Sequence, residues 1–257
     1  MPQVNWNPEL YLRFSRERLL PILDLLPHID PPRCDRLLDI GCGPGNAVQP
    51  ILQRWPKTSI VGLDSSPEMI EAARQNHGHC EWHLKDISEG LEEFGTFDVV
   101  FSNSVLHWLP NHDAAIRSFF ARLNPGGVLA VQLPNDNDSP FFLTVRQLAA
   151  SQRWVPYFTR GEIVHYGEVS LYYDILRSLT DDFRIWHSIY YHVVPSVQAI
   201  VEWYRATGLR PFLDQLQPEK QAEFEAELAE MLRELYPTRH GAVLFPFKRL
   251  FFTARNC

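Results

Sequence analysis

The sequence predicts an α/β fold built on a doubly wound, mostly parallel sheet. Short apolar runs such as residues 36–40 and 59–63 alternate with longer stretches of helical spacing through the first half of the 257-residue chain. A glycine-rich loop at residues 41–45 follows the first run and opens one of the helical stretches. Strands separated by helices of this length pair in parallel, because the chain must cross back over the sheet between them.

The predicted elements follow one another in a regular order. Asn7 and Pro8 form a helix start, with asparagine as N-cap and proline at the first helical position. Ser65 and Glu68 have the spacing of a capping box, with Pro67 in the first turn of the helix that follows. Periodicity predicts strands at 36–40, 59–63, 81–84, 97–102 and 127–133. It predicts one helix that begins at residue 8, a second at 46–55, a third that follows the capping box and ends near residue 75, and a fourth at 113–123.

The second half of the chain departs from this alternation. Residues 182–194 are strand-like, 195–236 carry helical signals only, and 243–254 return to a strand pattern. Open α/β sheets bind their ligands at the carboxyl ends of the parallel strands, and an inserted helical segment can cover that site. We therefore expect a single domain, 1–257, with an N-terminal cap helix at 1–30, an α/β core at 31–194 and 241–257, and a helical lid at 195–240.

Composition and charge narrow the function classes. Hydrophobic residues make up 45% and charged residues 21% of the chain, as in a folded globular protein. The formal net charge is -7 and lysine and arginine form no cluster, which disfavours a nucleic-acid partner. The N-terminus lacks a signal-peptide pattern and no apolar run is long enough to span a membrane, so we expect a soluble, cytoplasmic protein with no membrane partner.

Cysteine and histidine give no strong metal signal. Cys34, Cys42, Cys80 and Cys257 show no paired spacing, which fits a reducing compartment. The segment HGHCEWH at residues 77–83 concentrates imidazole and thiol groups, but no second ligand pair follows at a zinc-like spacing. We interpret this segment as a histidine-rich connection and predict no metal.

The loop Gly41-Cys42-Gly43-Pro44-Gly45 distinguishes two cofactor classes. A dinucleotide site needs glycines spaced as GxGxxG, with the helix N-terminus facing a pyrophosphate. Here the third glycine, Gly45, comes one residue too early for GxGxxG, and Asn46 occupies the position of the last glycine in that pattern. The pattern from Asp39 through Gly45 resembles motif I of class I S-adenosylmethionine-dependent methyltransferases. This resemblance implies a Rossmann-like sheet of seven strands with the last one antiparallel, and a ligand without phosphate.

Two further acidic residues fit the same cofactor. Asp64 ends the second strand, where a carboxylate can accept hydrogen bonds from both ribose hydroxyls, a role that NAD enzymes share. Asp86 follows the next strand and could accept from the adenine amino group. Met69 either covers the adenine ring or faces the core. The predicted cofactor-binding residues are Asp39, Gly41, Cys42, Gly43, Gly45, Asn46, Asp64, Ser65, Met69, Asp86, Ile87 and Asn103.

A closer resemblance runs in order over nearly the whole chain. It is carried by the segments WNPELYLRF, LLDIGCGPGN, GLDSSPEMI, NSVLHWLP, LNPGGVLAVQLP, YYDIL and YYHVVPSVQAIVEWYRATGLRPFL. Together these resemble trans-aconitate 2-methyltransferases, and the first and last segments lie in the parts of the chain that vary with substrate. The resemblance implies transfer of a methyl group from S-adenosylmethionine to a carboxylate of trans-aconitate or a close polycarboxylic acid, leaving a monomethyl ester and S-adenosylhomocysteine.

This chemistry needs positioning more than proton transfer. A carboxylate nucleophile is already ionised at neutral pH, so we expect no general base and no catalytic side chain in that role. Carboxylate recognition calls for cations and hydrogen-bond donors, and arginine pairs with carboxylates bidentately. The predicted substrate-binding residues are Tyr11, Arg18, His107, Trp108, Tyr172, Trp203, Arg210 and Arg249, with Tyr173, Tyr190, Tyr191 and His192 as further candidates.

Other functions remain open at this stage. The cofactor motifs do not specify the acceptor, so another small acid, a phenol, an amine or a carbon nucleophile is the main alternative. A non-catalytic cofactor-binding protein of the same fold is a second alternative, because a fold alone does not establish turnover. The sequence does not specify the oligomeric state.

Overall fold

The computed structural model describes residues 15–159, 165, 167–205 and 207–257. They form two compact units. The first comprises the described parts of residues 1–134 with 167–188 and 249–257, and the second the described parts of 135–166 and 189–248. Strands β6 (Phe183–Val194) and β8 (Ala242–Arg255) contribute residues to both units. The segment predicted as a lid, 195–240, lies within the second unit, together with residues 135–166 that were assigned to the core.

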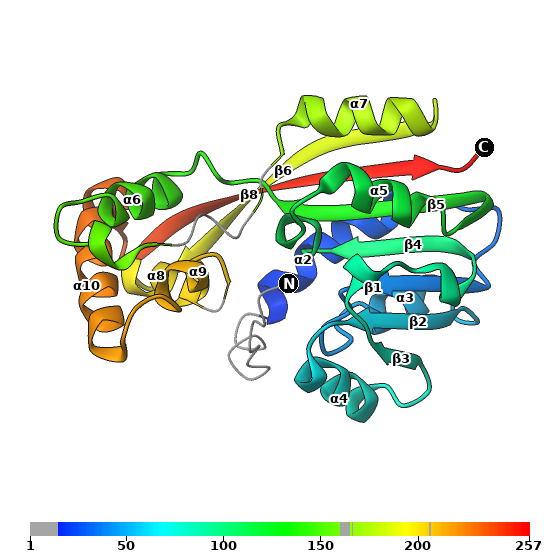
Figure 1. Ribbon diagram of the computed structural model, residues 1–257, viewed down its shortest axis with the longest axis horizontal. Coiled ribbons are helices and arrows are strands. Elements are labelled where there is room, and N and C mark those ends of the chain that lie inside the picture. Colours follow the sequence, from blue (N-terminus) through cyan, green and yellow to red (C-terminus); the bar gives the residue numbers. More distant parts are fainter. Residues whose placement is uncertain (1–14, 160–164, 166, 206) are drawn as a thin grey trace. The chain divides into compact units, whose positions relative to one another are not determined.

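The sheet has the predicted doubly wound, mostly parallel arrangement. Its strand order is β3-β2-β1-β4-β5-β8-β6, and β5 pairs with β8 antiparallel while the other pairs from β3 to β5 are parallel (Figure 1). A short strand, β7 (Thr238–Arg239), pairs with β8 and was not predicted. The other strands are β1 (Arg36–Ile40), β2 (Ser59–Asp64), β3 (Glu81–Leu84), β4 (Phe97–Asn103) and β5 (Leu123–Pro134).

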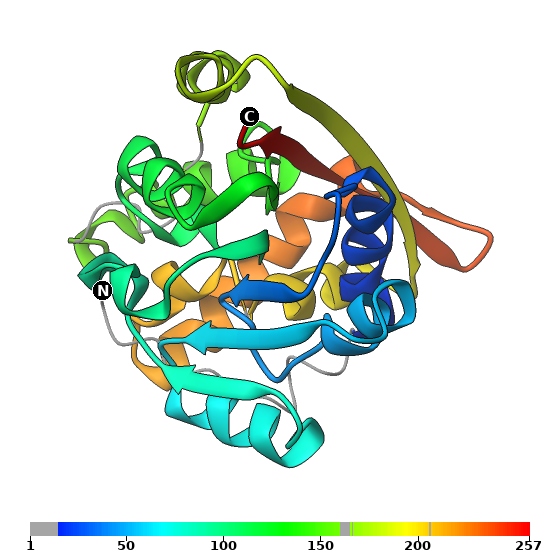
Figure 2. The same ribbon diagram turned by 90° about the vertical axis from the view of Figure 1, so that its right-hand side faces the viewer.

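Helices cover both faces of the sheet in the first unit. Helices α2 (Ser15–Leu25) and α3 (Val48–Arg54) lie on one face, and α5 (His112–Phe120) and α7 (Val169–Leu179) on the other (Figures 1 and 2). Helix α4 (Pro67–Asn76) packs beside β2 and β3. Its N-cap is Ser66, whose hydroxyl accepts from the Met69 backbone N–H at 3.2 Å, one residue after the N-cap that the spacing of Ser65 and Glu68 predicts. The helix start predicted at Asn7 lies outside the described residues.

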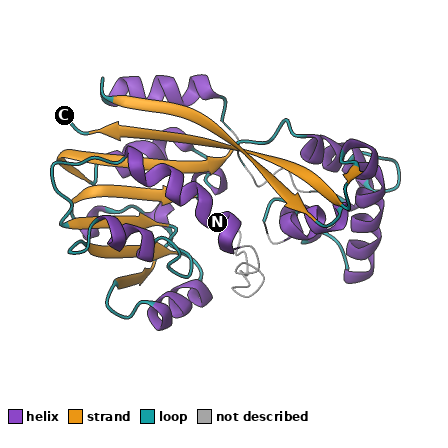
Figure 3. Cartoon of the chain, turned by 180° about the vertical axis from the view of Figure 1, so that it is seen from behind, coloured by secondary structure: helices purple, strands orange, loops and turns teal. Residues whose placement is uncertain are grey.

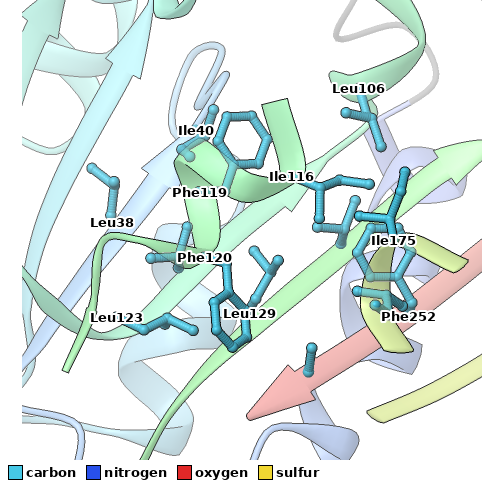
Figure 4. Close-up of a cluster of buried hydrophobic side chains, with 14 of the residues drawn as sticks. Leu38, Ile40, Leu106, Ile116, Phe119, Phe120, Leu123, Leu129, Ile175 and Phe252 are labelled. Carbon is cyan, nitrogen blue, oxygen red and sulfur yellow. The ribbon is translucent and has the colours of Figure 1, made fainter. Parts of the chain in front are cut away.

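The main hydrophobic core lies between the sheet and the helices α5 and α7. Figure 4 shows Phe119 and Phe120 of α5 among the strand side chains Leu38, Ile40 and Leu129, which alternate toward this face of the sheet. Burying a side chain of this size contributes about 1.5–3 kcal/mol, so this layer accounts for much of the stability of the first unit. The alternate residues of β1 and β5, among them Asp39 and Gln132, point to the opposite face.

The second unit gathers its helices around the remaining parts of β6 and β8 (Figure 3). Helix α10 (Pro218–Leu235) packs against α6 (Pro140–Ala149) and α8 (Val197–Arg205), and α9 (Arg210–Leu213) follows α8. The apolar side chains Phe224, Leu228 and Leu232 of α10 are buried, whereas Leu235 at its end is exposed. No helix in the described part of the chain is both long and apolar enough to cross a membrane.

Candidate functional site at the carboxyl ends of the parallel strands

The glycine loop after β1 turns through three left-handed residues. Gly41, Gly43 and Gly45 have φ values of 68°, 54° and 87°, a region that side chains other than glycine rarely adopt. A Cβ on Gly41 would lie 2.1 Å from Cγ2 of Val105, and one on Gly45 would lie 2.7 Å from the His77 ring. A Cβ on Gly43 would meet nothing within 4 Å. Gly41 and Gly45 are therefore packing positions, while the backbone of Gly43 can be approached closely by a ligand.

Asp64, at the end of β2, is fixed by two backbone donors. The Gly43 N–H donates to Oδ2 of Asp64 at 2.9 Å, and the Ser66 N–H donates to Oδ1 at 2.9 Å. Burial raises the pKa of this carboxyl, and the backbone hydrogen bonds oppose that rise. Each oxygen still has acceptor capacity for one further hydrogen bond. The side chain can therefore accept from two neighbouring hydroxyl groups, such as those of a ribose.

Asp39 is a second buried carboxyl beside this loop. It lies on β1 opposite Gly62 of β2 and Phe101 of β4, and only 2% of its surface is exposed. Burial, with a smaller contribution from the charge on Asp64, raises its pKa to about 7. Its Oδ2 has no hydrogen-bond partner among the described residues. A cation bound near this carboxyl would favour its ionised form.

Asp86, the third acidic residue predicted to bind the cofactor, follows the end of β3, the strand next to β2. Its Oδ1 accepts from the Ser88 backbone N–H at 3.0 Å and from the Ser88 hydroxyl at 2.7 Å. It caps a short 3-10 helix, Ile87–Glu89, in which Ile87 packs against the core. The backbone N–H of Lys85 donates to the Asp64 carbonyl at 2.9 Å. Asp86, the next residue, therefore lies close to Asp64 at the ends of β3 and β2.

The other predicted cofactor residues differ in exposure. Met69 and Cys42 are buried, Asn46 and Asn103 are half-buried, and Ser65 is exposed. Asn103 ends β4 next to the end of β1, and its side-chain oxygen has no partner among the described residues. The carboxyl ends of three adjacent strands thus bring together Asp39, Asp64 and Asn103.

A buried polar network lies further along the same edge. Arg249 of β8 is 4% exposed and donates from Nη1 to the Ser104 hydroxyl at 2.9 Å. That hydroxyl donates to Oε1 of Gln132 on β5 at 3.1 Å. The sequence reasoning selected Arg249 but neither Ser104 nor Gln132. The available signal was a glutamine inside the apolar run of β5, where a polar residue is out of place unless it is hydrogen-bonded.

His107 lies close to this network, in the 3-10 helix Leu106–Trp108 that follows β4. Its pKa is far below the ordinary value because burial, then the nearby charges of Arg249 and His112, disfavour the imidazolium. The Trp108 ring lies next to that of His107, with 4.9 Å between ring centroids. His107 is therefore a neutral hydrogen-bonding group at neutral pH.

Comparison with known proteins identifies the family. Residues 38–129 match a family model described as a methyltransferase domain. A trans-aconitate 2-methyltransferase from Escherichia coli O157:H7 is 41% identical over 253 residues, which cover 98% of this chain and 98% of that protein. The chain belongs to the trans-aconitate 2-methyltransferase family. A second member, from Variovorax paradoxus S110, is 36% identical over 256 residues, covering 98% of this chain and 99% of the relative.

A solved structure confirms the fold of this family member. The phosphoethanolamine N-methyltransferase 2 of Haemonchus contortus, solved with S-adenosyl-L-methionine, matches with a TM-score of 0.56 at 15% identity. The match covers 93% of this chain and 53% of that one. The prediction of a class I methyltransferase fold is therefore confirmed.

Two of the residues predicted to bind the substrate of this family member make packing contacts. Tyr172 is fully buried in the main core, where its hydroxyl is 2.9 Å from Nδ1 of His112 and its ring stacks on Phe252. Trp203 is buried in the second unit, against the ring of His192. These placements favour packing roles for Tyr172 and Trp203.

The remaining candidates differ in exposure, and two lie wholly or partly outside the described residues. Arg210 begins α9 in the second unit and pairs with Asp214 at 3.3 Å. Tyr173 of α7 and Tyr191 of β6 are exposed. Tyr190 and His192 stack on each other on the side of β6 opposite Tyr191, as strand alternation predicts. Tyr11 lies outside the described residues, and Arg18 lies in α2 with its side chain outside them.

The histidines of the segment at residues 77–83 contact other protein groups. His77 packs against Gly45 of the loop, and Nε2 of His83 lies 2.6 Å from Oε1 of Glu81. Among the described residues, no three histidine, cysteine, aspartate or glutamate side chains are grouped so as to hold a metal ion.

Proposed function

We propose that this chain is an S-adenosylmethionine-dependent carboxyl O-methyltransferase that converts trans-aconitate, or a close polycarboxylic acid, to a monomethyl ester. The observation that carries the proposal is the identity of 41% over 98% of both chains with a protein named trans-aconitate 2-methyltransferase. This similarity extends beyond the methyltransferase motif region, 38–129, into the parts of the fold that differ among acceptors.

The cofactor side of the proposal rests on the loop after β1. Gly43 offers open space at its backbone, and the fixed carboxylate of Asp64 can accept from both ribose hydroxyls. Asp86 would accept from the adenine amino group, and Asp39 would face the positively charged methionine portion. S-adenosylmethionine carries an ammonium and a sulfonium, so the buried carboxyl of Asp39 and the half-buried carboxyl of Asp64 suit its charge.

The reaction would proceed by direct displacement. A carboxylate oxygen of the acceptor forms a bond to the methyl carbon while the carbon–sulfur bond breaks, and sulfur takes the electron pair to become the neutral thioether of S-adenosylhomocysteine. The acceptor is ionised at neutral pH, so no proton has to leave before transfer. The protein aligns oxygen, carbon and sulfur in a site that excludes water, and such alignment can supply several kcal/mol.

Mass detection of products tests this function directly. The purified protein is incubated with S-adenosylmethionine carrying a deuterated methyl group and with single acids from a panel: trans-aconitate, cis-aconitate, citrate and a monocarboxylic acid. We expect a monomethyl ester of trans-aconitate that carries the label, formed in equal amount with S-adenosylhomocysteine. Labelled phenols or amines without esters would overturn the acceptor assignment, and cofactor binding without any labelled product would favour a non-catalytic role.

A further inference from the structure

The network around Arg249 has an unusual backbone element at its centre. Ser104, directly after β4, is one of two non-glycine residues with positive φ among those described, at 62°. Its backbone N–H donates to the Gln132 carbonyl at 2.8 Å, and its hydroxyl donates to the Gln132 side chain while accepting from Arg249. The left-handed turn therefore places one hydroxyl between an arginine and a glutamine that come from different strands.

Strand register places these side chains on one face of the sheet. Strand β5 lies between β4 and β8 (Figure 1). Asn103 of β4 pairs with Gln132 of β5, and Pro134 of β5 pairs with Arg249 of β8. Residues opposite one another share a face, and so do residues two apart along a strand. Arg249 and Gln132 therefore share the face that α2 covers, at the same carboxyl ends where Asp64 and Asn103 lie.

The network holds buried polar atoms that lack a partner among the described residues. Gln132 is fully buried, and its Nε2 has no partner among the described residues. The Nδ1 of His107 is also buried without a described partner, and His107 is close enough to Arg249 for that charge to lower its pKa. A buried donor without an acceptor costs about 1–3 kcal/mol, and an apolar residue at position 132 would avoid this cost. The donors are better explained by a ligand than by packing.

A carboxylate matches these donors. It is planar, negatively charged and accepts through two oxygens, which suits a guanidinium beside an amide and an imidazole. Arginine bonds would withdraw electron density from a carboxylate and occupy its oxygens, which makes that group a poorer nucleophile. A polycarboxylic acid has one carboxylate to be held in this way and another to accept the methyl group.

We propose that Arg249 binds a carboxylate of the acceptor that is not methylated, with Ser104 and Gln132 as positioning residues for its guanidinium. This inference rests on the proposed function. It makes Arg249 the residue that selects acids with more than one carboxylate, because a monocarboxylic acid whose only carboxylate accepts the methyl group leaves the buried Gln132 Nε2 beside Arg249 without an acceptor.

Equilibrium binding separates this site from turnover. Calorimetry measures trans-aconitate binding to the protein saturated with S-adenosylhomocysteine, for wild type, R249M and Q132E. R249M should lose at least about 30-fold in affinity. Q132E places a carboxylate inside the network, so it should compete with the acceptor and weaken its binding at least about tenfold. Neither variant should change the affinity for S-adenosylhomocysteine by more than about twofold.

Matched variants separate local from general effects. Lys248→Met removes an equal charge from the adjacent residue, which pairs with Asp138 instead, and should leave trans-aconitate affinity unchanged. Ser104→Gly keeps the positive φ without strain and removes only the hydroxyl, so it should raise KM several-fold and leave kcat nearly unchanged.

The outcomes are distinguishable. If the wild type forms the ester while R249M and Q132E bind trans-aconitate normally, the carboxylate site is wrong and the proposed function stands. If the wild type binds trans-aconitate with these mutational effects but forms no ester, the site stands and the proposed function is wrong. Where R249M does not fold, as circular dichroism would reveal, normal binding by Q132E is sufficient to overturn the inference.

Discussion

The backbone N–H of Gly43 donates a 2.9 Å hydrogen bond to Oδ2 of Asp64, so the glycine loop and the end of β2 form one rigid structure. The bond joins the first loop of the fold to the second strand, 21 positions later. It holds the carboxylate that we assign to the ribose beside Gly43, the glycine of this loop whose Cβ position is open. Cofactor affinity should therefore depend on both residues.

Asp64→Ala should weaken S-adenosylmethionine binding by about 3–6 kcal/mol. The change removes the acceptor of two ribose hydrogen bonds to a charged group, each contributing about 1.5–3 kcal/mol, and it frees the Gly43 N–H. Calorimetry on the folded variant measures the affinity. Glu71→Ala is the control, because Glu71 is exposed and bonds only with Gln75 among the contacts described. An unchanged affinity in the Asp64 variant would remove Asp64 from the site.

Gly43→Ala should abolish cofactor binding while keeping the fold. A methyl group at this position meets no protein atom within 4 Å, so it would occupy the space assigned to the ligand. Gly241→Ala is a matched control, since Gly241 also has positive φ and open space at its Cβ position. Both variants should lose a similar, small amount of thermal stability from backbone strain, about 1 kcal/mol. Only Gly43→Ala should lose binding; equal binding by the two variants would contradict the assignment.

Binding of S-adenosylmethionine at pH 6 should release a proton from Asp39. The folded pKa of this carboxyl is about 7 against an ordinary value of 3.8. The group is therefore mostly protonated at pH 6, and a cationic ligand favours its ionised form. Calorimetry in buffers of different ionisation enthalpy measures the release, which should approach one proton per ligand at pH 6 and vanish near pH 8.5. Asp39→Asn should bind without release.

The same shift predicts how the stability of the ligand-free protein depends on pH. Because the folded pKa is raised, the contribution of Asp39 to stability is fully present below the unfolded pKa and is lost as pH rises through about 7. Wild type should therefore lose stability relative to Asp39→Asn between about pH 4 and pH 7. Denaturant unfolding at several pH values measures the difference. A difference that grows in the opposite direction would show that Asp39 is ionised in the fold.

The rate of ester formation should be nearly flat in pH. The acceptor carboxylates ionise well below neutrality, and burial beside Arg249 keeps His107 neutral, so no group has to lose a proton near pH 7 before transfer. With cofactor and acid saturating, kcat should vary by less than about threefold between pH 6.5 and 8.5. A rise of about tenfold per unit would reveal a general base and contradict direct displacement.

Tyr172→Phe should lower stability without changing catalysis. The variant removes a buried hydroxyl that bonds with His112, which costs about 1–3 kcal/mol and lowers the melting temperature by several degrees. The melting temperature and kcat/KM for trans-aconitate are measured on the same preparation. An unchanged melting temperature with a large loss of kcat/KM would restore Tyr172 to the substrate site.

The sequence by itself determined the fold class and the cofactor side of the candidate site. Local signals were sufficient there, because the loop from Gly41 to Gly45 and the acid Asp64 follow strands whose ends meet in any parallel sheet. The capping-box spacing of Ser65 and Glu68 predicted the start of α4 to within one residue, and the short apolar runs of β1 and β2 predicted those two strands. Motifs of neighbouring residues also carried the resemblance to the family.

Only the tertiary structure decided which polar residues of the variable regions meet. Ser104, Gln132 and Arg249 lie on three different elements, and strand register together with one left-handed turn brings their side chains into contact. Periodicity gives the face of a residue but not its partner across the sheet, so Tyr172 and Arg249 were equal candidates in the sequence. The fold separates them, because α7 packs Tyr172 into the apolar core while the antiparallel pairing of β8 with β5 carries Arg249 to the carboxyl ends of the parallel strands.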